Sequence, residues 1–207
     1  MSILTLTFGI MLLDVDLDGD LDLFTANGHV IHEIERTQDG VAFRQPPHLF
    51  FNDGKGNYKD VAPEIGGVLT APLVARGAAC ADYDRDGDLD ILVTENGGPV
   101  HLWRNESEGV GRHYLRVTVD GSISNRNGYG VQLIAVVGER RMYRRIRSGS
   151  SFLSHSEAVA TFGLGAATEV DTLIVQWPGG KVERLTAVKA DREIKLFEGV
   201  EKNLASY

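Results

Sequence analysis

The chain has 207 residues, 43% of them hydrophobic, and its 21 basic and 29 acidic side chains give a formal net charge of −8. This composition supports a folded core and excludes a disordered or collagen-like chain. The 24 glycines favour short elements joined by tight turns over long helical bundles. The single cysteine, Cys80, excludes an intrachain disulfide, and we expect it to be a buried thiol.

Charge divides the chain into two parts. Residues 1–110 contain 19 acids and 7 bases, whereas residues 111–207 contain 10 acids and 14 bases. The change from −12 to +4 predicts one domain over residues 1–110, a second over residues 111–200 and a short tail over residues 201–207. The acidic first domain disfavours nucleic acid or anionic membranes as partners and favours cations.

The chain begins with an apolar stretch, residues 3–13, which is too short to cross a bilayer. No basic residue precedes it and no small-residue cleavage site follows it, so we expect a strand rather than a signal peptide. The sequence therefore predicts no membrane span and no signal peptide in this chain.

Two acidic segments of the form D-x-D-x-D-G-D-L-D lie 68 residues apart. Their aspartates are Asp14, Asp16, Asp18, Asp20 and Asp22 in the first loop, and Asp82, Asp84, Asp86, Asp88 and Asp90 in the second loop. Ca²⁺ takes roughly six to eight oxygen ligands, which alternating aspartates on a curled loop supply, and glycine at the sixth place permits the turn. We expect about two Ca²⁺ ions, one per loop, bound by the side chains at places one, three, five and nine and by the backbone carbonyl at place seven.

The flanking residues do not fit an EF-hand. An EF-hand needs a glutamate at place twelve, where this chain has Thr25 and Val93, and helices on both sides, where it has strand-forming residues. Each loop therefore joins two strands. Two other interpretations stay open: a solvated acidic turn without metal, and a glycosidase pair of aspartates, although nothing in the sequence predicts a raised pKa for one of them.

Short strands around the loops repeat. The first copy has expected strands at residues 21–27, 48–51 and 58–61, with a glycine-rich turn over 52–57; the second has strands at residues 77–80, 91–95 and 99–105. Units of this length with short antiparallel strands are typical of propeller blades.

Phe8-Gly9, the two aspartate loops and the Asn-Asp-Gly-Lys-Gly-Asn-Tyr segment of residues 52–58 resemble the FG-GAP/VCBS repeats of integrin-type β-propellers. The resemblance covers roughly residues 8–108 and implies an all-β fold in which calcium loops tie together the first two strands of each blade. Such propellers have about seven blades, whereas two at most are present here. Because an open ring exposes strand edges, we expect the missing blades upstream in a longer chain, or else pairing of the edge with another chain.

Residues 111–200 alternate in the manner of strands at 114–119, 131–137, 172–177 and 193–197, with turns at 125–128 and 178–180. This pattern predicts a compact β-sandwich. Four segments, residues 124–130, 148–154, 162–165 and 175–180, resemble the ASPIC/UnbV domain. With residues 27–30 and 102–105, they resemble the cartilage-acidic-protein family. That resemblance implies a secreted, extracellular or periplasmic protein, linked with the extracellular matrix and adhesion, whose partner is an unknown extracellular protein or glycan.

Four further features have simpler explanations. Five arginines between Arg140 and Arg147 suit a sulfated glycan or another polyanion, but an exposed strand whose charges block edge pairing is the favoured interpretation. Residues 148–154 with His155 lack the G-x-S-x-G elbow of serine hydrolases and read as a structural turn. His29 and His32 lack a third metal ligand. We expect Trp103 and Trp177 to be core or interface anchors.

The function predicted from these features is a calcium-binding, extracellular adhesion-type module without catalytic residues. The alternatives are a calcium-dependent hydrolase or carbohydrate-active enzyme that uses the acidic loops, and a polyanion binder that uses the arginine-rich strand.

Overall fold

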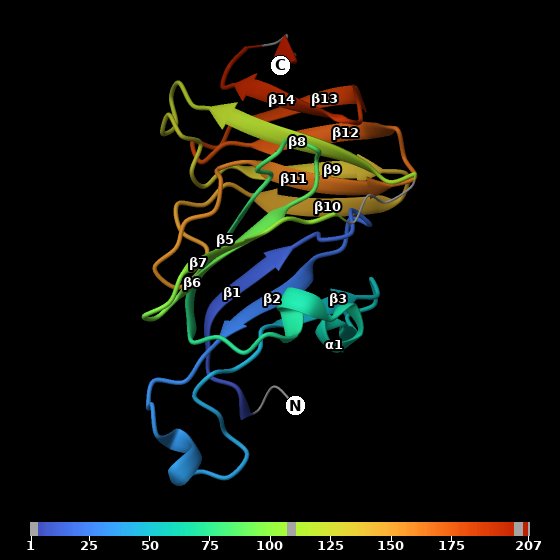
Figure 1. Cartoon of the computed structure of the whole chain (residues 1–207). Coiled ribbons are helices and arrows are strands. Elements are labelled where there is room, and N and C mark those ends of the chain that lie inside the picture. Colours follow the sequence, from blue (N-terminus) through green and yellow to red (C-terminus); the bar gives the residue numbers. More distant parts are fainter. Residues whose placement is uncertain (1–3, 107–110, 201–204, 207) are drawn as a thin grey trace.

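Almost all regular structure in the protein is β-strand, as expected (Figure 1). The computed structural model describes residues 4–106, 111–200 and 205–206. Helical segments are short: α1 (Ala62–Ile65) and the 3₁₀ turns η2 (Ile34–Arg36) and η3 (Gly67–Thr70). None of the helices in the described part of the chain has the length and apolar character that crossing a membrane requires.

The first half forms two blade-like antiparallel sheets. The first sheet contains, in chain order, β1 (Thr7–Leu13), β2 (Asp22–Asn27), β3 (His48–Asn52) and β4 (Tyr58–Asp60). The second contains β5 (Ala75–Ala81), β6 (Asp90–Glu95) and β7 (Val100–Trp103). An aspartate loop joins the first two strands of each sheet. Two such sheets do not close a ring, so the fold is an incomplete propeller, as the sequence predicted.

Side chains alternate along β1 in the way that a strand requires. Met11 and Leu13 are buried, whereas Ile10 is 49% and Leu12 is 56% exposed. The buried side chains pack with those of β2, β5 and β6 in one hydrophobic cluster. The two sheets therefore bury one face against each other and leave the other face of β1 largely in solvent.

The two sheets approach each other most closely where β1 lies beside β5 (Figure 1). A Cβ atom added to Gly9 would lie 2.7 Å from the Cβ of Ala78 and 3.0 Å from the Cβ of Ala26. No larger side chain fits at this point without moving a strand. The Phe-Gly pair of residues 8–9 therefore has a packing role between the two blades.

The second half is a β-sandwich, hereafter the C-terminal sandwich. One sheet has the order β10 (Arg140–Arg145), β9 (Gln132–Val137), β12 (Glu169–Gln176) and β13 (Val182–Lys189). The other has the order β11 (Ala160–Gly165), β8 (His113–Asp120), β14 (Arg192–Phe197) and β15 (Ala205–Ser206). All neighbouring strands are antiparallel except β8 and β14, which are parallel.

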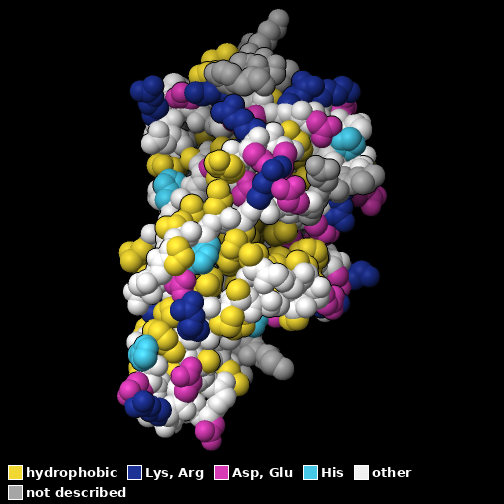
Figure 2. Space-filling model, in the orientation of Figure 1, with side chains coloured by type: hydrophobic (Ala, Val, Ile, Leu, Met, Phe, Trp, Pro, Cys, Tyr) yellow, Lys and Arg dark blue, Asp and Glu magenta, His cyan; other side chains and the backbone are white. Residues whose placement is uncertain are grey.

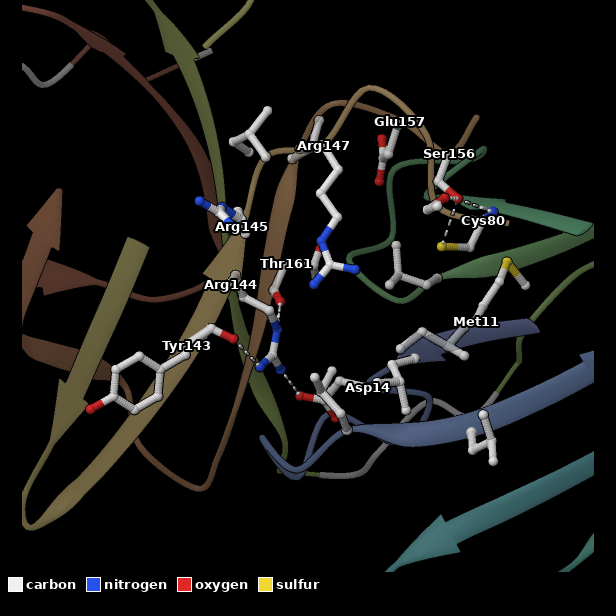
Figure 3. A pocket seen from close by; sticks show the side chains of 18 of the residues that line it. Met11, Asp14, Cys80, Tyr143, Arg144, Arg145, Arg147, Ser156, Glu157 and Thr161 are labelled. Carbon is white, nitrogen blue, oxygen red and sulfur yellow. Dashed lines mark hydrogen bonds and ion pairs between the residues drawn. The ribbon is translucent and has the colours of Figure 1, made fainter. Parts of the chain in front are cut away.

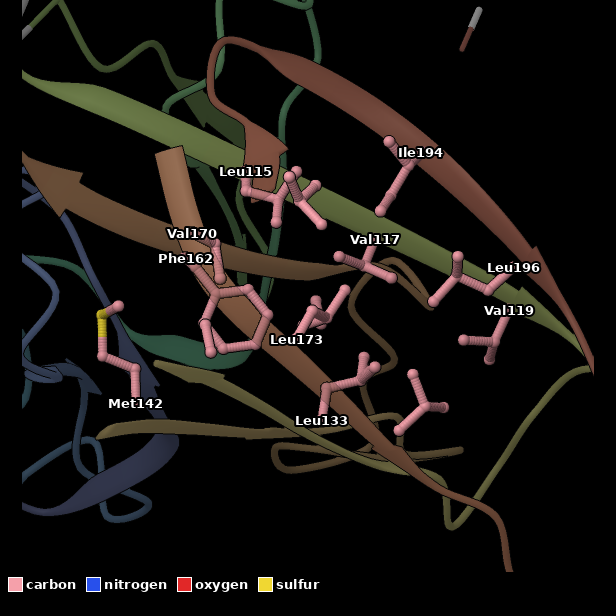
Figure 4. Packing of buried hydrophobic residues seen from close by; sticks show 14 of the residues in the cluster. Leu115, Val117, Val119, Leu133, Met142, Phe162, Val170, Leu173, Ile194 and Leu196 are labelled. Carbon is pink, nitrogen blue, oxygen red and sulfur yellow. The ribbon is translucent and has the colours of Figure 1, made fainter. Parts of the chain in front are cut away.

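The two sheets of the sandwich enclose a continuous apolar core (Figure 4). Leu115, Phe162 and Leu173 are fully buried in it. Trp177 is also buried in this core, and Trp103 packs edge-to-face on Phe24 in the blade cluster, with ring centroids 5.9 Å apart. Both tryptophans are core anchors, as expected.

Some expectations about individual elements were wrong. The strands β11 and β13 were not predicted, because β11 contains the glycine-rich residues 162–165 and β13 is a largely exposed, polar edge strand. Cys80 is only partly buried, because it lines a cavity between the blades and the second half of the chain. The strand expected over residues 3–13 begins at Thr7, and most of the expected tail, residues 201–207, lies outside the described residues.

Residues 148–157, hereafter the docking segment, join the C-terminal sandwich to the blades. The Ser151 hydroxyl accepts a hydrogen bond from the backbone N–H of Ile10 at 3.0 Å, and the Ser156 hydroxyl accepts one from the backbone N–H of Cys80 at 3.1 Å. The Phe152 ring packs edge-to-face on Phe8, with centroids 5.0 Å apart. The docking segment, whose first part was expected to be a structural turn, therefore contacts both blades.

Candidate metal centre

The two aspartate loops have the same backbone conformation. The fourth residue is left-handed in both, with φ of 57° at Leu17 and 64° at Arg85. The sixth residue also has positive φ, 94° at Gly19 and 103° at Gly87. Non-glycine residues rarely adopt positive φ, so the repeated conformation shows that both loops curl in one specific way. The glycine at the sixth place therefore has the role that the sequence predicted.

The first loop gathers three of its five aspartates. Asp14, Asp16 and Asp18 each offer one carboxylate oxygen within 4.8 Å of the other two. Asp14 is buried, with 1% of its surface exposed. Asp20 and Asp22 lie outside this group. Asp20 instead forms an ion pair with an arginine of the C-terminal sandwich.

The second loop gathers a slightly different set. Asp82, Asp84 and Asp90 have oxygens within 4.8 Å of one another, and both Asp82 and Asp90 are buried. Asp86 and Asp88 lie outside the group. Asp88 is nevertheless almost fully buried, with 4% of its surface exposed.

The aspartate at the ninth place connects each loop to the strands around it. Asp22 accepts hydrogen bonds of 3.0 Å from the backbone N–H groups of Val15 and Asn52. In the second loop, Asp90 accepts hydrogen bonds of 2.8 Å from the backbone N–H groups of Tyr83 and Asn105. This bracing of the loop was not predicted from the sequence, although the asparagine that follows a strand in both repeats is a signal for it.

Three buried carboxylate oxygens have no hydrogen-bond partner among the described residues: Oδ1 of Asp14, Oδ1 of Asp82 and Oδ1 of Asp88. An unsatisfied buried oxygen is costly, and native proteins rarely leave one without a proton, a water or an ion. Since the side-chain atoms gathered in each group are all carboxylate oxygens, the site suits a hard cation such as Ca²⁺.

Burial raises the pKa of five loop aspartates, and most strongly that of three of them. The pKa of Asp14 rises to about 6, that of Asp22 to about 7 and that of Asp88 to about 8. In each case loss of hydration is the largest cause, and neighbouring carboxylates such as Asp86 beside Asp88 raise the pKa further. A bound cation would oppose both effects, because it supplies the missing positive charge.

Arginines of the C-terminal sandwich reach the first loop. Arg144 donates to Oδ2 of Asp14 at 3.2 Å (Figure 3). Two more arginines pair with this loop, each at 2.8 Å: Arg112 with Asp16, and Arg140 with Asp20. These partners were not predicted from the sequence.

The signal that could have found Arg140 and Arg144 is the alternation along β10. Arg141, Tyr143 and Arg145 point to solvent, as expected for one face of a strand. On the opposite face, Arg140 and Arg144 contact the first loop, and Met142 between them is buried in the core of the C-terminal sandwich. The arginine-rich strand therefore divides into a face that binds the chain's own aspartates and a face that is free of the loop.

The second loop is covered by Arg116 and Tyr114 of β8. The Arg116 guanidinium is buried and lies 3.3 Å from Asp82 Oδ2, 2.9 Å from Glu157 and 3.4 Å from Glu193. The Tyr114 ring packs so closely on the loop that a Cβ added to Gly87 would lie 2.0 Å from it. Both aspartate loops therefore lie at the joint between the blades and the sandwich.

A cavity of about 410 Å³ lies at the same joint. Figure 3 shows Asp14 and Arg144 on one side of it and Glu157, Ser156 and Cys80 on another. Figure 2 shows acidic side chains clustered around basic ones in the upper half of the molecule, above a region rich in hydrophobic side chains. Ion pairs between the blades and the C-terminal sandwich are gathered at this joint.

The histidines do not form a second site. His29 Nδ1 accepts a hydrogen bond from the backbone N–H of Ile31, and His32 packs beside Phe43. Within the described part of the chain, groups of three or more potential metal ligands occur only in the aspartate loops.

Comparisons with known proteins agree with this architecture. Residues 14–93 match the family model of the FG-GAP-like repeat, and residues 121–203 match that of ASPIC and UnbV. Cartilage acidic protein 1 of Xenopus tropicalis is 27% identical over 180 residues, which cover 82% of this chain and 25% of that protein. The proteins of the same name from Mus musculus and Homo sapiens are each 30% identical over 110 residues, about half of this chain. The chain thus spans a quarter or less of the length of these relatives.

Proposed function

Because residues 14–93 match the FG-GAP-like repeat and residues 121–203 match ASPIC and UnbV, we propose that the chain is a calcium-stabilised, non-catalytic binding module that acts outside the cell. The observation that carries the proposal is the set of buried carboxylate oxygens without a partner at Asp14, Asp82 and Asp88. A cation in each loop would satisfy the oxygens of Asp14 and Asp82, which belong to the two ligand groups.

The residues that would hold the first ion are Asp14, Asp16 and Asp18, and those for the second are Asp82, Asp84 and Asp90. Calcium would supply positive charge to carboxylates that repel one another, and its long, flexible coordination suits several monodentate aspartates. In the first loop, Asp22 supports these ligands through backbone hydrogen bonds and Asp20 through an ion pair with Arg140.

The role outside the cell rests on chemistry and on the relatives. Loops with few fixed ligands suit the millimolar calcium of extracellular fluid, where weak sites are filled. The relatives' name, cartilage acidic protein, describes a tissue and a charge and no enzymatic activity. We extend both points to this chain.

Calorimetric titration of metal-stripped protein with Ca²⁺ tests the proposal. We expect two binding events in the natural sequence and the loss of one in each of the variants Asp16→Asn and Asp84→Asn. Both side chains lie in a ligand group but are more exposed than Asp14 and Asp82, so the fold should tolerate the change. The control Asp39→Asn, an exposed acid outside the loops, should keep both events. Absence of binding heat in the natural sequence would refute the proposal.

A second candidate function, polyanion binding, is favoured by the exposed face of β10. Arg141 and Arg145 flank Tyr143 on an edge strand, and all three are exposed. Such a face suits sulfate groups. The double variant Arg141→Gln/Arg145→Gln should then elute from immobilised heparin at lower salt than the natural sequence, with or without chelator. Equal elution would exclude this function.

A further inference from the structure

The first aspartate of the first loop is shared between the loop and the C-terminal sandwich. Oδ2 of Asp14 accepts hydrogen bonds from the backbone N–H of Gly163 at 3.0 Å and from Arg144 at 3.2 Å. Oδ1 of the same carboxylate is buried and has no partner in the described part of the chain. The sandwich thus holds one oxygen of Asp14 and leaves the other available to an ion.

Strand β11 lies directly on this loop. The backbone N–H of Gly165 donates to the carbonyl of Leu17 at 3.0 Å. A Cβ added to Gly163 would lie 2.4 Å from the Leu17 backbone and 2.6 Å from Oδ2 of Asp14. Since Phe162 and Leu164 point into the sandwich core, Gly163 must face the loop, and only glycine allows this approach.

Charge also favours a shared site. The first loop has five aspartates, and three arginines of the C-terminal sandwich pair with three of them: Arg112, Arg140 and Arg144. If every group is ionised, two negative charges remain, and one divalent cation would neutralise them. The second loop receives one arginine from the sandwich, Arg116, which also pairs with two glutamates.

We propose that the C-terminal sandwich is part of the first calcium site, in which Gly163 and Arg144 are positioning residues that hold Asp14 with Oδ1 turned toward the ion. The inference rests on the proposed calcium function and adds that the blades alone do not complete the site. Groups that orient a metal ligand typically change metal affinity about 10- to 100-fold. By thermodynamic reciprocity, calcium must then tighten the joint as much as the joint tightens calcium.

Gly163→Ala is the test variant because it changes no charge. Substituting Arg144 by a neutral residue would have two opposite effects on calcium affinity. Loss of the positioning contact would weaken binding, whereas loss of a positive charge close to the cation would strengthen it. The titration is made in Asp84→Asn protein, in which only the first loop is left to bind. We expect Gly163→Ala to raise the calcium Kd at least tenfold. The control Gly149→Ala, whose added Cβ meets nothing within 4 Å, should keep the original Kd.

Hydrogen exchange provides the reciprocal measurement. Calcium should slow exchange in β11 and in the docking segment of the natural sequence, and should slow it much less in Gly163→Ala. A residue with only a structural role would lower the melting temperature without changing the calcium Kd or this calcium-dependent protection.

The outcomes separate the two proposals. If the natural sequence binds no calcium, the proposed function is wrong. If it binds calcium and folded Gly163→Ala protein binds with unchanged Kd, only the shared site is wrong. Should Gly163→Ala fail to fold, Arg144→Lys replaces it, since lysine keeps the charge but loses the bonds that Arg144 also donates to the carbonyls of Tyr143 and Thr161. An unchanged Kd in that variant would likewise overturn the shared site.

Discussion

A carboxylate whose loss of hydration outweighs its favourable contacts binds its proton more tightly than one in water, and this effect is large for three loop aspartates. The pKa is about 6 for Asp14, about 7 for Asp22 and about 8 for Asp88, against a usual value of 3.8. Each aspartate therefore favours the folded state most when it is protonated. This contribution is complete below pH 3.8 and is lost as the pH rises through about 6 to 8.

Metal-stripped protein should accordingly be less stable at pH 8 than at pH 5. Urea unfolding at the two pH values measures the difference. With saturating calcium the ions replace the protons, so the loss of stability toward pH 8 should shrink or reverse. Equal stability of the stripped protein at both pH values would show that these carboxylates do not titrate in the folded state.

Glu198 is also a buried acid, but its pKa is lowered, unlike the pKa values of the loop aspartates. Burial disfavours its charge, but hydrogen bonds from the backbone N–H groups of Ser122, Ile123 and Ser124 and from the Ser124 hydroxyl outweigh this and lower its pKa. Glu198→Gln would place an amide against these donors and should destabilise the protein by about 2–3 kcal/mol in chemical unfolding. In the control Glu64→Gln, which breaks only an exposed ion pair with Lys59, the loss should be far smaller. Equal losses would contradict the inferred role of the Glu198 donors.

At the scale of elements, the contact between β1 and β5 depends on a missing side chain. Gly9→Val would force the two strands apart at Ala78, and overpacking of this kind typically costs about 1–3 kcal/mol. Ile10→Val, one residue along on the half-exposed face, should cost much less. Thermal unfolding of the two variants makes the comparison, and similar melting temperatures would show that the strands can separate freely at this point.

The two faces of strand β10 have different environments. Its period of two places Arg140 and Arg144 on the aspartate loop and leaves Arg141 and Arg145 in solvent. The sequence predicted an exposed strand, and one face of β10 is exposed. It did not predict what the other face contacts, because the acidic loop lies more than a hundred residues earlier in the chain.

At the scale of the whole molecule, calcium should stabilise both parts of the chain together, because both loops lie under the C-terminal sandwich. An ion that binds only the folded state at 100 times its Kd adds about 2.7 kcal/mol per site. The melting temperature should therefore rise with free calcium, and the rise should be smaller in Asp84→Asn than in the natural sequence. A melting temperature indifferent to calcium and to chelator would contradict the coupling of metal to stability.

Local sequence by itself determined the strands that flank the aspartate loops, the curl of both loops and the anchoring role of Trp103 and Trp177. These features depend on neighbours within a few residues, on alternation of side chains and on the conformational freedom of glycine. Strand β11 escaped prediction because its glycines, which are typical of turns, serve a contact that is distant in sequence.

Only the tertiary structure decided which aspartates are gathered, which brace the loops and which pair with arginines. The ninth-place aspartates Asp22 and Asp90 are occupied by backbone donors from the next strands, and Asp14 meets Arg144 across 130 residues of chain. Such partners are chosen by how two sheets and a sandwich pack around a buried charge. Desolvation and Coulomb energy depend on that packing, which no local pattern of residues encodes.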